Sequence, residues 1–91
     1  MYLEIVSPEA TLFSGEVTSV AVPGINGEFE MLNSHAPIVS ILKEGQIKIS
    51  GTVSLDEDVE SKFTKQDGKT MLAINSGTLE INDNKIIILA D

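Results

Sequence analysis

The sequence predicts an all-β domain, a sandwich or barrel of short strands. Eleven isoleucines, seven valines and six threonines make up about a quarter of the 91 residues, and such β-branched side chains are enriched in strands. Apolar and polar residues alternate along short runs, which are separated by turn-forming residues at intervals of about eight to twelve positions. Short strands at this spacing are typical of β-sandwiches and barrels.

Five runs alternate between apolar and polar residues with a period of two. Each is predicted to be a strand with one face in the core and one face in water. Two other runs, residues 38–42 and 86–89, are apolar on both faces. They are predicted either as central strands with both faces covered or as strands whose second face is a contact surface. The five alternating runs centre on Leu3 and Ile5, Val20 and Val22, Ile47 and Ile49, Val53 and Leu55, and Leu79 and Ile81.

The region around residues 56–68 combines a turn signal with a weak helix signal. Asp67-Gly68 favours a type I′ hairpin, because both central residues of that turn need φ > 0. Residues 56–65 begin with acidic side chains, as the first turn of a helix does, but Val59 and Phe63 are their only apolar anchors. We therefore expect a loop or an extended hairpin arm, with at most a single helical turn.

Composition excludes several classes of protein. Fourteen Asp and Glu residues oppose six basic residues, all Lys, and the net charge is −8, so the chain lacks the clustered cations that nucleic acids and anionic lipids require. The absence of Cys rules out disulfides and thiolate metal sites. The longest apolar run, residues 86–90, is too short to span a membrane, and the N-terminus lacks a signal-peptide pattern. We expect a soluble intracellular protein.

Glu28 and Glu30 are two residues apart, so on a strand their side chains point the same way. Paired carboxylates can act as the acid and base of a glycosidase. No deep pocket and no Trp for sugar stacking are available in so small a chain. We favour a solvated edge opposite Phe29 and Met31, or an acidic face that docks onto a basic partner.

Three other features are weaker candidates for chemistry. The acidic run of residues 56–60 lacks the glycine and the spacing of an EF-hand loop, so a solvated loop is favoured over a cation site. His35 is the only histidine and has no Gly-x-Ser-x-Gly elbow near it. Residues 24–27 match neither a dinucleotide fingerprint nor a P-loop. The residues therefore predict a binding or structural module, with no catalytic constellation, no metal and no cofactor.

Several short motifs follow one another in a fixed order. They are Leu12-Phe13-Ser14-Gly15-Glu16-Val17, Gly27-Glu28-Phe29, His35-Ala36-Pro37-Ile38 and Ser76-Gly77-Thr78-Leu79-Glu80-Ile81. This order and spacing resemble the epsilon subunit of F-type ATP synthase, which is called delta in mitochondria. The Gly-Glu-Phe and His-Ala-Pro blocks are the most specific part. The resemblance covers nearly the whole chain and is weakest over residues 50–69.

The resemblance implies a single domain over residues 1–91, a flattened antiparallel β-sandwich of about ten strands. It implies a non-catalytic rotor subunit in the central stalk, at the cytoplasmic face of the bacterial inner membrane. Such a subunit binds gamma and the polar loops of the c-ring, and it helps to couple rotation to ATP synthesis. Glu28 matches the acidic residue on the ring side, and Glu30 is an extra charge beside it. The loop that packs near gamma is matched by His35, Ala36, Pro37 and Ile38.

The sequence departs from the family pattern in two places. Many members continue into two C-terminal helices, which bind ATP or inhibit hydrolysis in some of them, whereas this sequence ends at Asp91. Without those helices we expect neither a C-terminal helical domain nor ATP binding. Residues 51–69 are longer than the resemblance suggests and are interpreted as a lengthened hairpin at the rim. The alternative function is a free-standing β-sandwich adaptor or ligand-binding module, because strands that are apolar on both faces could line a groove.

Overall fold

The computed structural model describes residues 1–32 and 37–91, which form ten strands and one short helix. No helix among these residues has both the length and the apolar character needed to cross a membrane. The expectation of an all-β domain with about ten strands is confirmed. The elements are β1 (Tyr2–Val6), β2 (Thr11–Glu16), β3 (Ser19–Gly24), β4 (Gly27–Met31), β5 (Ile38–Leu42), β6 (Gly45–Ser50), α1 (Glu57–Glu60), β7 (Phe63–Gln66), β8 (Lys69–Ile74), β9 (Gly77–Asn82) and β10 (Lys85–Ala90).

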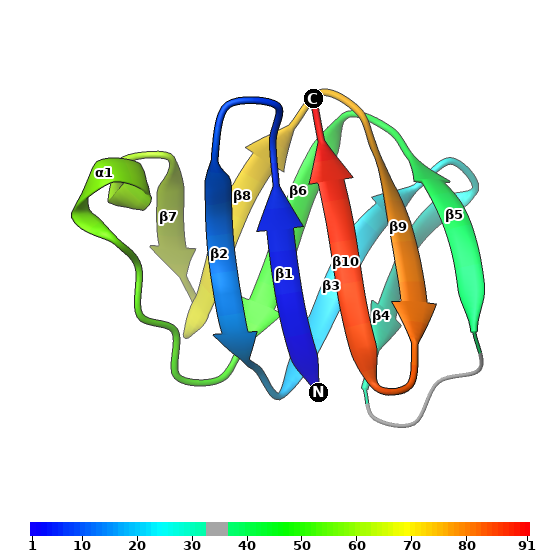
Figure 1. The fold of residues 1–91 in the computed structure, drawn as a ribbon, viewed down its shortest axis with the longest axis horizontal. Coiled ribbons are helices and arrows are strands. Elements are labelled where there is room, and N and C mark those ends of the chain that lie inside the picture. The colour runs from blue at the N-terminus through cyan, green and yellow to red at the C-terminus, as the bar shows by residue number, and fades with distance from the viewer. Residues whose placement is uncertain (33–36) are drawn as a thin grey trace.

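The strands form one sheet that curls into two layers (Figure 1). Its order is β2-β1-β10-β9-β5-β3-β6-β8-β7, and β4 pairs with β3 beside this path. The layer nearest the viewer in Figure 1 contains β2, β1, β10, β9 and β5, and the remaining strands lie behind it. Every pairing among the described strands is antiparallel except that of β1 with β10, which is parallel. The parallel pair joins the first and last strands, so no hairpin connection is needed between them.

The core lies between the two layers and is built from the apolar positions of the alternating strands. β1 shows the pattern clearly, because Leu3 and Ile5 are fully buried while their neighbours are half-buried. β9 alternates in the same way through Leu79 and Ile81. The period-two prediction is therefore confirmed for these strands. The largest fully buried side chains are Leu3, Ile5, Met31, Leu42, Ile47, Ile49, Leu79, Ile86, Ile88, Val20 and Val22.

Two hairpin turns use the left-handed backbone region. Asp67 and Gly68 have φ values of 54° and 76°, which fits the predicted type I′ turn between β7 and β8. Asp83 and Asn84 adopt φ values of 50° and 62° in the turn between β9 and β10. Asp and Asn tolerate this conformation better than other side chains do.

The predicted strand at Val53 and Leu55 is wrong. Residues 51–55 form no backbone hydrogen bond with another described residue, although both apolar side chains pack against the core. The cause is Gly51, whose φ of 121° turns the chain out of the sheet at the end of β6. Residues 56–65 were expected to form a loop or hairpin arm that could include one helical turn, and that turn is present as α1 (Glu57–Glu60), with Val59 buried.

Candidate functional site

An acidic edge lies on β4, the strand that follows the tight turn after β3. Glu28 and Glu30 are exposed, whereas Phe29 is half-buried and Met31 is fully buried. The two carboxylates therefore share the outer face of β4, as their spacing predicted. Gly27 begins the strand with a backbone φ of 123°, a conformation that residues other than glycine rarely adopt.

Lys48 joins this edge from a strand that is not adjacent to β4. β3 lies between β4 and β6, and its residue Ala21 pairs with Glu30 on one side and with Lys48 on the other. The Nζ atom of Lys48 lies 3.0 Å from Oε1 of Glu28, and the two side chains are 33% and 52% exposed. The lysine thus reaches across β3, which presents only the small Ala21 and Pro23 at this point.

Glu30 has a different partner. The buried Ser19 hydroxyl donates a hydrogen bond of 3.1 Å to Oε2 of Glu30. One carboxylate is therefore ion-paired and the other is held by a neutral donor.

The glycosidase alternative needs a substrate pocket between the two carboxylates. Both carboxylates lie on an open surface instead, and Glu28 lines a shallow hollow of about 520 Å³ together with Lys48 and Lys43. This geometry suits docking of a charged partner.

A second surface lies on the outside of the other layer. We call it the outer apolar face, and it comprises Val39, Ile41, Ile87 and Leu89. Val39, Ile41 and Leu89 are 75%, 60% and 53% exposed, and Ile87 is half-buried. The sequence left open whether the second face of these two apolar strands is core or contact surface. The structure leaves Val39, Ile41 and Leu89 of that face exposed and Ile87 half-buried. The strand register aligns Val39 with Glu80 and Ile87 in one row, and Ile41 with Thr78 and Leu89 in the next.

The predicted gamma-side residues are only partly described. His35 and Ala36 lie outside the described residues. Pro37 is exposed and Ile38 is half-buried at the start of β5, directly before Val39. Glu28 lies at the other end of this strand, because Gly24 pairs with both Gly27 and Leu42. Among the described residues, Glu28 and Ile38 therefore lie toward opposite ends of β5.

Comparison with known proteins agrees with this architecture. Residues 1–91 match the β-sandwich domain of the ATP synthase Delta/Epsilon chain. The chain belongs to this family. It is 41% identical over 91 residues to the ATP synthase epsilon chain of Campylobacter concisus. That match covers 100% of this chain and 60% of the relative. It is 37% identical over 89 residues to the ATP synthase epsilon chain of Chlorobium limicola, covering 98% of this chain and 86% of the relative.

A solved structure supports the same fold. A chain in the cryo-EM structure of the Tetrahymena thermophila mitochondrial ATP synthase central stalk and c-ring superposes with a TM-score of 0.74 at 14% identity. The match covers 99% of this chain and 62% of that one. This member of the Delta/Epsilon family thus spans about three fifths of the length of the Campylobacter relatives.

Sequence reasoning missed Lys48 and did not decide whether Val39, Ile41 and Leu89 are core or surface. Lys48 stands at a polar position of an alternating strand, which marked it as solvated. Only the pairing of β3 with both β4 and β6 brings it to Glu28. The described residues gather no group of three or more His, Asp or Glu side chains that could hold a metal ion.

Proposed function

We propose that this chain is a non-catalytic rotor subunit of an F-type ATP synthase, at the cytoplasmic face of the bacterial inner membrane. It binds the gamma subunit and the polar loops of the c-ring and helps to couple proton-driven rotation to ATP synthesis. Membership of the ATP synthase Delta/Epsilon family supports the assignment of the chain to this complex. The structural observation that best supports the proposal is the outer apolar face, where three large apolar side chains are more than half exposed.

The outer apolar face is the proposed gamma contact. Val39 and Ile41 lie on the same face as Leu89, with Thr78 and Glu80 of β9 between them. Several large apolar side chains exposed on one face mark an interaction site. Val39 and Ile41 follow directly on Pro37 and Ile38, which the family resemblance assigns to the gamma side with His35 and Ala36. In this proposal gamma contacts both Pro37 and the outer apolar face, which lie next to each other in the chain.

The acidic edge is the proposed ring contact. Glu28 and Glu30 are exposed on β4, and Glu28 lies near the end of β5 that is away from Ile38. A domain with one apolar face and a separate acidic edge can contact two partners at once, gamma through the first and basic ring loops through the second. The net charge of −8 also attracts a basic partner and should speed its association with the chain.

Co-purification with the cognate gamma subunit, followed by native mass spectrometry, tests the proposal. We expect a one-to-one complex. The Val39→Lys variant should weaken it by about tenfold or more, because an ammonium would be desolvated at the interface. The Thr64→Lys variant is the matched control, because it adds the same charge at an exposed position on β7, in the other layer.

Two outcomes would contradict the proposal. A well-folded chain that forms no complex with gamma would favour the free-standing adaptor. Equal binding by the Val39→Lys and Thr64→Lys variants would remove the outer apolar face from the contact. The ring assignment is tested separately with Glu28→Lys, which should reduce coupling of ATP hydrolysis to proton pumping in the assembled enzyme. Loss of the exposed pair with Lys48 should lower the stability of the isolated chain by about 1 kcal/mol or less.

A further inference from the structure

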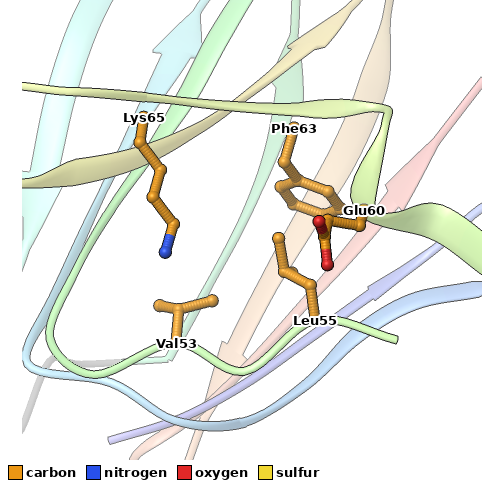
Figure 2. Close-up of a pocket in the computed structure, with 5 residues that line it drawn as sticks. All are labelled: Val53, Leu55, Glu60, Phe63 and Lys65. Carbon is orange, nitrogen blue, oxygen red and sulfur yellow. The ribbon is translucent and has the colours of Figure 1, made fainter. Parts of the chain in front are cut away.

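A hollow of about 480 Å³ lies between residues 51–56 and β7, in the stretch that is longer than the family resemblance suggests. Val53 and Leu55 project into it from the segment that left the sheet at Gly51, and Phe63 and Lys65 project into it from β7 (Figure 2). Its volume falls within the range of ligand-binding pockets, roughly 300–1,000 Å³. Neither the acidic edge nor the outer apolar face uses these residues.

The floor of the hollow is apolar and packs against the core. Phe63 belongs to the core with 8% of its surface exposed, and Val53 and Leu55 are half-buried and packed against that core. The segment that carries Val53 and Leu55 has no backbone hydrogen bond to other described residues. Side-chain packing alone therefore holds this wall in place, so it can adjust to an incoming apolar side chain without breaking a sheet hydrogen bond.

The two charged groups of the hollow lie toward opposite ends. Figure 2 shows the Lys65 ammonium above Val53, and the Glu60 carboxylate beside Leu55 and Phe63. Among the described residues, the ion pairs within 4.0 Å involve neither Lys65 nor Glu60. The hollow therefore offers a cation, an apolar floor and an anion in sequence, with both charges available to a ligand.

Lys65 occupies an unusual position for a lysine. It stands two residues after Phe63 on β7, so it shares the core-facing side of that strand, whereas Thr64 and Gln66 take the opposite side. The Lys65 side chain is nevertheless exposed, and a lysine on an edge strand also hinders pairing with another chain. Protection of the edge requires no ligand, so a preference for ligands of one charge pattern distinguishes a binding role from edge protection.

We propose that this hollow binds an extended peptide segment of a partner protein, with an acidic, an apolar and a basic residue at alternate positions. Strand residues two apart are separated by about 6.6 Å, so the ligand's alternate side chains match the repeat of Phe63 and Lys65. The acidic residue pairs with Lys65, the apolar residue fills the floor, and the basic residue pairs with Glu60. The inference is independent of the contacts with gamma and the ring.

Nuclear magnetic resonance titration of the ¹⁵N-labelled chain with acetyl-Glu-Thr-Leu-Thr-Lys-amide tests this proposal. We expect saturable amide shifts at millimolar peptide, confined to residues 51–66. Peptides with Lys at both ends or Glu at both ends should bind more weakly by a factor of about 2 to 5, the size of one exposed ion pair. Replacing the central Leu of the peptide with Ser should abolish binding.

A charge reversal supplies the decisive comparison. The Lys65→Glu variant should prefer the peptide with Lys at both ends, whereas the control Lys62→Glu, an exposed lysine outside the hollow, should keep the original preference. If Lys65→Glu does not fold, Glu60→Lys tests the other end and should prefer the peptide with Glu at both ends. Absence of saturable shifts, or an unchanged ranking in the charge-reversed variant, would overturn the proposal.

Discussion

The ammonium of Lys48 and the carboxylate of Glu28 lie 3.0 Å apart although β3 separates their strands. The pair forms because Lys48 extends past the small Ala21 toward the start of β4. Part of the negative charge of Glu28 is therefore balanced within the chain. A basic partner that approaches Glu28 competes with Lys48 for the carboxylate.

Lys48→Gln should strengthen association with a basic ring loop. The substitution frees the Glu28 carboxylate, and we expect binding at low salt to become tighter by a factor of about 2 to 5, as for an exposed ion pair. The measurement is surface plasmon resonance against a gamma–c-ring subcomplex at low and moderate salt. Lys43→Gln is the control, because it removes the same charge from the same hollow without breaking an ion pair with Glu28. Identical gains in the two variants would show that only net charge matters.

Ile88→Ala and Leu89→Ala should differ sharply in stability although they are neighbours on β10. Ile88 is fully buried, and its truncation should lower the free energy of unfolding by about 2–5 kcal/mol. Leu89 is 53% exposed on the outer apolar face, so its truncation should change that free energy by about 0.5 kcal/mol or less. Urea denaturation of the isolated chain measures both, and similar losses would contradict the assigned faces.

Gly77→Ala should destabilise the fold through a backbone clash. A Cβ atom at Gly77 would lie 2.6 Å from the Leu89 carbonyl oxygen, which belongs to the paired strand β10 and cannot turn aside as a side chain can. We expect a loss of about 1–3 kcal/mol in the free energy of unfolding. Gly15→Ala is the comparison, since its Cβ would meet only the Phe13 ring, at 3.3 Å. A smaller loss for Gly77→Ala than for Gly15→Ala in thermal denaturation would argue against this explanation.

Moderate salt should stabilise the isolated chain. The net charge of −8 produces self-repulsion that is greatest in the compact state, and salt near physiological strength screens interactions beyond about 8 Å. The melting temperature measured by circular dichroism should rise between low and moderate salt. A fall would indicate that the exposed ion pairs, including that of Glu4 with Lys85 at 3.8 Å, outweigh the repulsion.

Most of the fold could be predicted from local patterns. The alternation at Leu3 and Ile5 and the Asp67-Gly68 turn each depend on residues that are neighbours in the chain. The prediction failed at Val53 and Leu55, where the alternation is present but the strand is not. Alternation indicates which side chains face the core. A strand also needs a neighbouring strand edge that forms hydrogen bonds with its backbone. The positive φ at Gly51 carries the chain away from that edge.

The sequence alone determined an acidic all-β chain, the shared face of Glu28 and Glu30, and the motifs of the Delta/Epsilon family, because these follow from composition, from the two-residue repeat of a strand and from motif order. The tertiary structure decided that Lys48 reaches Glu28, that Val39, Ile41 and Leu89 stay uncovered, and that Glu60 and Lys65 flank one hollow. Each of these features depends on which strands pair and how the sheet curls, and those choices join residues that lie far apart in the chain.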